Sequence, residues 1–216
     1  AEIGVASTKA FTGQMLVLYI LTLKISFLKK DIDKKVFEQK IKELKKLPKL
    51  IKTTLSIESE IENISNTFAN AKGSMFLGRG FAYPIAMEGA LKLKELCYVH
   101  AEGYPAGEMK HGPLALIEEG IPVVVLAPRD KYYEKTLSNM QEVISRGAKV
   151  LLISNKSKNE ISSENVWKTI EVEKTSDELL PFLLTVPLQI LAFHSAKNKG
   201  YDIDKPRNLA KSVTVE

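Results

Sequence analysis

Short apolar runs alternate with segments of helical periodicity over most of this 216-residue chain. The run Val123–Leu126 is apolar at every position, as a strand must be when helices cover both faces of its sheet. We predict five strands, at Ser74–Gly78, Tyr98–Ala101, Pro122–Ala127, Lys149–Ser154 and Lys168–Val172. Helices are expected between and after them, at 83–97, 105–117, 131–146 and 177–199. This alternation predicts an α/β fold, a three-layer sandwich with a five-stranded parallel sheet flanked by helices.

Long helices are expected before the sheet, at 8–30, 32–46 and 48–69, with Pro48 separating the last two. We therefore divide the chain into a helical lead-in at 1–68, an α/β domain at 69–200 and a polar tail at 201–216. The chain begins without a methionine or a lead-in sequence, so we expect it to be a fragment or one half of a longer polypeptide.

Composition excludes several classes of protein. The single cysteine, Cys97, excludes a disulfide scaffold and a zinc site built on several thiolates. No two of the three histidines have the spacing of metal ligands, and we expect neither a metal nor another cofactor. The longest apolar run, Met15–Leu23, is shorter than the roughly 20 residues of a membrane helix, and no secretory signal is visible. We expect a soluble, cytoplasmic protein without a membrane partner.

Basic residues are concentrated in one segment. The net charge is +5, but residues 24–52 alone hold eleven lysines and four acidic residues, a local charge of +7. These lysines alternate with apolar residues at helical spacing, and no arginine lies among them. The pattern favours a solvated helix face over a nucleic-acid-binding surface.

Two features near the expected sheet could carry chemistry. Gly78-Arg79-Gly80 follows a strand, where small residues let backbone N–H groups approach a phosphate, but a tight turn also explains the glycines and is the favoured interpretation. Glu88, Lys92 and Glu95 share one face of the next helix. A partly desolvated carboxylate near the helix C-terminus would suit a general base, although a surface ion pair is the simpler interpretation.

His111 lies in a loop at 102–113 that contains two prolines and three glycines, a setting in which reactive side chains are often placed. A catalytic and a structural role are equally compatible with this position. We expect His100 and His194 to be structural. Lys211, six positions from the end of the sequence counting itself, is expected to be a solubilising residue unless the tail folds back over a site.

Four collinear stretches resemble the C-terminal part of the glucosamine-6-phosphate synthases, the glutamine:fructose-6-phosphate aminotransferases (isomerizing). They are Glu2–Thr12 (EIGVASTKAFT), Phe76–Glu95 (FLGRGFAYPIAMEGALKLKE), His100–Ile117 (HAEGYPAGEMKHGPLALI) and Pro206–Glu216 (PRNLAKSVTVE). The isomerase part of this family consists of two sugar-isomerase (SIS) subdomains with five-stranded parallel sheets. The resemblance implies that this chain holds the second, with a lead-in that completes the first and a tail that closes over the sugar.

The resemblance also implies roles for individual residues. Glu95 matches the base that moves a proton between C1 and C2 of the sugar, and Lys92 matches a lysine beside it. His111 matches a histidine that assists ring opening across a dimer interface, and Lys211 matches a lysine that forms a Schiff base with the open-chain sugar. Positions that line the sugar match Val5, Ser7 and Ala210.

The implied reaction converts fructose 6-phosphate and glutamine to glucosamine 6-phosphate and glutamate. The implied partners are the upstream SIS and glutaminase parts of the same enzyme and a second copy in a homodimer. The phosphate-binding loop of the family lies in the first subdomain, so this chain alone is not expected to turn over. The alternative is a non-catalytic SIS-type module that binds a sugar phosphate in regulation, and the well-matched tail argues against it.

Overall fold

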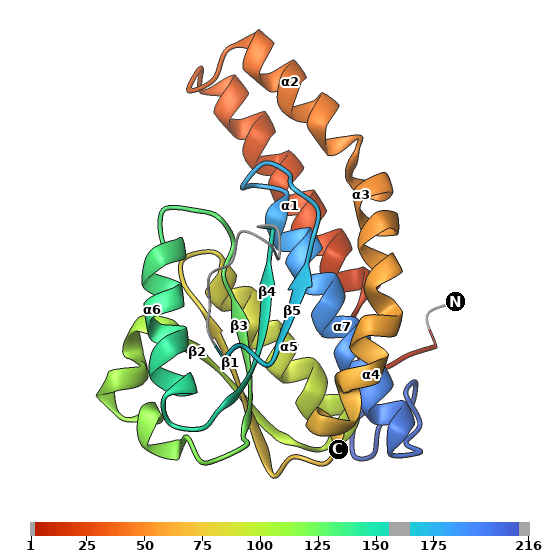
Figure 1. Cartoon of the computed structure of the whole chain (residues 1–216). Coiled ribbons are helices and arrows are strands. Elements are labelled where there is room, and N and C mark those ends of the chain that lie inside the picture. Colours follow the sequence, from red (N-terminus) through yellow and green to blue (C-terminus); the bar gives the residue numbers. More distant parts are fainter. Residues whose placement is uncertain (1–2, 156–164, 212–216) are drawn as a thin grey trace, which may run out of the picture.

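The computed structural model of the chain describes residues 3–155 and 165–211 (Figure 1). Five parallel strands form one sheet in the order β2-β1-β3-β4-β5. Helices cover both faces of this sheet, so the predicted α/β three-layer sandwich is confirmed. The strands are β1 (Gly73–Gly78), β2 (His100–Pro105), β3 (Pro122–Leu126), β4 (Lys149–Ser154) and β5 (Lys168–Glu171).

The two faces of the sheet belong to two hydrophobic clusters. Val124 and Leu126 of β3 pack into the first, with α4 (Glu58–Ala69), α5 (Ala82–Cys97) and α7 (Leu180–Asn198). Val123 and Val125 point to the opposite face and join the second cluster, with α6 (Tyr133–Ile144). Because alternate side chains of a strand point to opposite faces, this explains why the strand is apolar throughout.

Strand β2 lies elsewhere than predicted. We expected a strand at Tyr98–Ala101, but Tyr98 takes the left-handed conformation (φ 58°) and ends α5, so β2 begins at His100. The strand then continues to Pro105 in parallel register with β1. Glycine and proline are tolerated there because β2 is an edge strand.

Two predicted helices are interrupted. The expected helix at 105–117 is two 3₁₀ helices, η2 (Ala106–His111) and η3 (Pro113–Leu116), which separate at Gly112 because its φ of 139° is open mainly to glycine. The expected helix at 48–69 is α3 (Leu47–Thr54), the 3₁₀ turn η1 (Leu55–Ile57) and α4. In the α3–η1 junction, Thr54 and Ser56 hydroxyls donate to backbone carbonyls, which competes with regular helix bonding.

The first two helices, α1 (Lys9–Leu28) and α2 (Lys34–Leu44), form a hairpin that projects beyond the sheet (Figure 1). The rings of Phe27 and Phe37 stack at its turn with centroids 4.9 Å apart. By length and composition alone, α1 and α7 could each cross a membrane. In the most apolar 18-residue stretch of each helix, 78% of the α7 residues are buried and form part of the core, whereas only 6% of the α1 residues are buried. Exposed apolar residues on α1 include Val17, Leu18, Leu21 and Leu28.

Candidate active site

A row of three charged side chains runs along α5. The Lys92 ammonium donates a hydrogen bond of 2.5 Å to Glu95 Oε2 and lies 3.5 Å from Glu88 Oε1. Lys92 is only 2% exposed, while 23% of the Glu95 side chain reaches solvent. A surface ion pair therefore does not describe this row: a buried ammonium is held by two carboxylates, of which Glu95 is the more accessible.

Burial raises the pKa of Glu88 above its ordinary value of 4.5, with Lys92 opposing the rise and Glu95 adding to it. This carboxyl also lines a cavity of about 490 Å³ between α1, α5 and β2. The site therefore contains a carboxylate whose ionised form is disfavoured by its surroundings.

The raised pKa of Glu88 predicts a pH-dependent stability. A carboxyl group whose pKa is higher in the folded state binds its proton more tightly there, so its stabilising contribution is lost as pH rises through the folded pKa. We expect the free energy of unfolding of the parent minus that of Glu88→Gln to fall as the pH rises from the ordinary carboxyl pKa of 4.5 through the raised pKa of Glu88 in the folded state. Urea denaturation at several pH values measures this difference. The exposed control Glu134→Gln should give no such slope, and a difference that rises with pH would contradict the assignment.

The C-terminal segment packs against the end of α5. The Arg207 amide donates to Tyr98 Oη at 2.8 Å, and the Arg207 guanidinium lies 4.1 Å from the centroid of the Tyr98 ring. The same ring packs against Tyr201, with centroids 4.8 Å apart. Since Tyr98 follows Glu95 by three positions, these contacts bring the segment to the end of the helix that carries the charged row.

The N-terminal segment joins the same assembly. The Val5 amide donates to the Asp204 carbonyl at 2.9 Å, and Lys211 Nζ donates to the Gly4 carbonyl at 3.2 Å. Ser7 is half-buried just before α1, and Ala210 is exposed beside Lys211. The structure thus brings the N-terminal segment, at Gly4 and Val5, next to the C-terminal segment, and Lys211 lies on a segment that folds back. Residues 212–216 of the last matching stretch lie outside the described residues.

His111 lies on the other side of the sheet from Glu95. It is on η2, which packs with α6 in the second hydrophobic cluster, whereas α5 belongs to the first. Its side chain is 73% exposed, and its Nδ1 lies 2.7 Å from Glu108 Oε2. Residues three apart on a 3₁₀ helix eclipse each other, which accounts for this pair. A single chain therefore does not bring His111 to Glu95.

The other histidines differ from each other. His194 is buried, with Nε2 3.0 Å from Glu58 and Nδ1 3.4 Å from Glu62, as expected of a structural residue. His100, in contrast, is exposed and lies 3.4 Å from Glu102, so the expectation of a structural residue is wrong there. It is at the first position of an edge strand, and 78% of its side chain is exposed.

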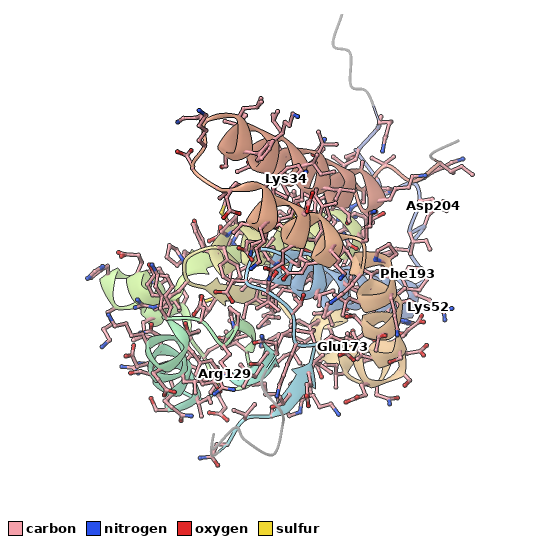
Figure 2. All side chains as sticks on the ribbon, turned by 90° about the horizontal axis from the view of Figure 1, so that it is seen from above. Lys34, Lys52, Arg129, Glu173, Phe193 and Asp204 are labelled. Carbon is pink, nitrogen blue, oxygen red and sulfur yellow. The ribbon has the colours of Figure 1, made fainter. Side chains whose placement is uncertain are left out.

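The Gly78-Arg79-Gly80 loop is a tight turn. A Cβ on Gly78 would lie 2.4 Å from the Ala82 carbonyl oxygen, and one on Gly80 (φ 54°) would lie 2.8 Å from the Tyr132 ring. Arg79 Nε donates to Asn139 Oδ1 at 3.2 Å. Close packing thus accounts for both glycines. A second loop at the carboxyl end of the sheet follows β3 and contains Arg129. Arg129 and Asp204 lie on opposite sides of the molecule, so this second loop is remote from the C-terminal segment (Figure 2).

No metal centre is found in the described part of the chain, where no group of three or more His, Cys, Asp or Glu could hold an ion. Cys97 is buried, donates to the Ala192 carbonyl, and has its pKa raised by burial to about 12, so the thiol is inert at neutral pH. Sequence reasoning missed two residues that join the tail to other segments: Tyr98 joins it to the end of α5, and Asp204 joins it to the N-terminal segment.

The chain is similar to known proteins along its full length. The sequence profile of the SIS domain family, described as "SIS domain", matches residues 67–198. Glutamine–fructose-6-phosphate aminotransferases (isomerizing) of Bacteroides thetaiotaomicron and Bartonella quintana are 51% and 46% identical over 215 residues. These alignments cover 100% of this chain and 35% of each relative, so the chain spans about a third of their length.

Solved structures of other proteins also superimpose on this chain. The C-terminal domain of glucosamine-fructose-6-phosphate aminotransferase from Francisella tularensis superimposes with a TM-score of 0.91 at 46% identity, over 95% of this chain and 58% of that one. A glucosamine-6-phosphate deaminase from Thermotoga maritima gives a TM-score of 0.65 at 25% identity, over 98% of this chain and 58% of that one.

Proposed function

The chain belongs to the SIS domain family, and we propose that it is the isomerase half of a glutamine–fructose-6-phosphate aminotransferase (isomerizing). The complete enzyme would convert fructose 6-phosphate and glutamine-derived ammonia to glucosamine 6-phosphate. The observation that carries the proposal is the 46–51% identity to such enzymes over 215 residues, which includes the two segments that meet at Val5 and Asp204. The proposal includes the partners: the upstream SIS and glutaminase parts and a second copy of the chain.

In the proposed reaction, Lys211 forms an imine with the C2 carbonyl of the open-chain sugar and releases water. Ammonia then replaces the lysine amine at C2. Glu95 takes a proton from C1 and returns it to C2, while the C1 hydroxyl loses its proton and the imine nitrogen gains one, which leaves an aldehyde at C1 and an amine at C2. The accessibility of Glu95 and the buried cation 2.5 Å from its carboxylate support this role, because a substrate can reach the carboxylate and the hydrogen bond from Lys92 fixes its position.

His111 would open the sugar ring in the pocket of the partner subunit. The position of His111 across the sheet from Glu95 supports this assignment, because one chain cannot supply both groups to one pocket. Val5, Ser7 and Ala210 would line the sugar, and the domain limits 1–68, 69–200 and 201–216 stay part of the proposal.

A complementation assay tests the proposed function. Isomerisation of fructose 6-phosphate is measured with this chain alone, with the separately produced upstream SIS part, and with both. Activity only on mixing is the expected result, because the two parts then complete one pocket. Activity of this chain alone would contradict the split site, and no activity on mixing would favour a non-catalytic sugar-phosphate-binding module.

A further inference from the structure

Tyr98 occupies a backbone conformation that does not suit it. It is the C-cap of α5 with φ 58° and ψ 26°, and its amide donates to the Lys94 carbonyl. Glycine is the usual residue at such a helix end, because a Cβ crowds the following carbonyl oxygen in the left-handed region. A tyrosine at this position indicates that its side chain makes contacts a glycine could not make.

The Tyr98 side chain contacts both ends of a turn in the C-terminal segment, which runs from Tyr201 to Arg207. The ring packs on Tyr201 where the chain leaves α7, and it accepts from the Arg207 amide six residues later. Between these points the amides of Asp204 and Lys205 donate to Asp202 Oδ1 and close the turn. Tyr98 therefore contacts the segment before and after its tightest part.

The turn also determines where the residues beyond it can lie. Pro206 is buried beside the anchored Arg207, and the Asp204 carbonyl accepts from the Val5 amide. Lys211 lies only four positions after Arg207, and its ammonium reaches the Gly4 carbonyl. Four residues of extended chain span at most about 14 Å, so the anchored Arg207 limits the positions open to Lys211.

We propose that Tyr98 is a positioning residue: it anchors the segment 201–211 to the end of α5 and so keeps Lys211 near the end of the helix that carries Glu95. The reactive consequence rests on the proposed function, whereas the anchoring itself does not. Glu95 and Tyr98 are neighbours at the end of one helix, which means that the base and the anchor of the Schiff-base lysine are held by the same rigid element.

Hydrogen exchange tests the anchoring without any assay of activity. In this chain, Tyr98→Phe removes the Oη acceptor and keeps the ring, whereas Tyr98→Gly removes both and suits the backbone conformation. We expect the Arg207 amide to exchange about tenfold faster in both variants, and the Val5 amide to do so only in Tyr98→Gly. Because glycine fits the left-handed position, this variant should stay folded.

The control is Tyr83→Phe, at a half-buried tyrosine near the start of the same helix. It should leave both amides unchanged. Unchanged exchange of the Arg207 and Val5 amides in folded Tyr98→Gly would overturn the proposal, since the segment would then hold its position without the anchor.

The complete enzyme gives the second readout. We expect Tyr98→Gly to lower kcat for fructose 6-phosphate about tenfold, and Tyr98→Phe to retain most of it. Borohydride trapping of the Lys211 imine should fall in parallel. Faster exchange with unchanged kcat and trapping would overturn the positioning role. If the parent enzyme itself lacks isomerase activity, the proposed function fails, while exchange still decides whether Tyr98 anchors the segment.

Discussion

Glu95→Gln should lower the rate of fructose 6-phosphate isomerisation by the complete enzyme by about 10²–10⁴-fold. Glutamine keeps the shape of the side chain but cannot accept a proton from C1, and the loss should therefore fall on the chemical step. The fold should survive, because Lys92 retains Glu88 as a counter-ion 3.5 Å away. Steady-state kinetics with the purified variant, together with its circular dichroism spectrum, measures both expectations.

Two controls separate loss of the base from general damage. Glu134→Gln changes an exposed carboxylate in the first turn of α6, on the opposite face of the sheet, and should leave the rate unchanged. Hydrolysis of glutamine by the same Glu95→Gln enzyme should persist, because the proposal assigns that step to another domain. A variant that kept a near-parent isomerisation rate would remove Glu95 from the role of base.

Sequence periodicity predicts correctly those strands whose apolar residues are also the residues buried in the core. Strands β3 and β4 begin at the predicted residues because apolar side chains fill both faces of the sheet. Strand β2 lies later in the sequence than predicted, because the residues Glu102, Gly103 and Pro105 resemble a loop. Only pairing with β1 makes this segment a strand. Local patterns do not contain that pairing.

The candidate site was predictable where its residues share one helix. Spacing places Glu88, Lys92 and Glu95 on one face, but the burial of Lys92 depends on how α5 packs against its neighbours. Tyr98 carries no signal of its own, since its contacts are with residues more than 100 positions away. These contacts depend on the tertiary fold.

The location of the site also differs from the usual one. Ligands of open parallel sheets bind at the carboxyl ends of the strands, which is where Gly78-Arg79-Gly80 lies. Helix α5 runs back from the end of β1 to the start of β2, so Glu95 and Tyr98 lie toward the amino ends instead. A pocket begun by another part of the enzyme would explain this placement.

Lys92→Met should be the most destabilising of the single substitutions in this site. Methionine preserves the unbranched stem, but it removes the only cation within 4.0 Å of the Glu88 and Glu95 carboxylates among the described residues. Two carboxylates then face each other without compensation. Breaking a buried ion pair on one side costs about 3 kcal/mol at the lower end of measured values, which suits a site that Glu95 keeps partly open to water.

Urea denaturation of Lys92→Met, with Lys94→Met as an exposed control on the same helix, measures this loss. The control should stay within about 0.5 kcal/mol of the parent. Adding Glu88→Gln to Lys92→Met should restore about 1 kcal/mol or more, because one uncompensated charge is removed, and the loss should shrink as the pH falls through the raised pKa of Glu88. A loss equal to that of Lys94→Met would mean that the ammonium is not held between the two carboxylates. The role of Lys92 beside Glu95 would then rest on proximity alone.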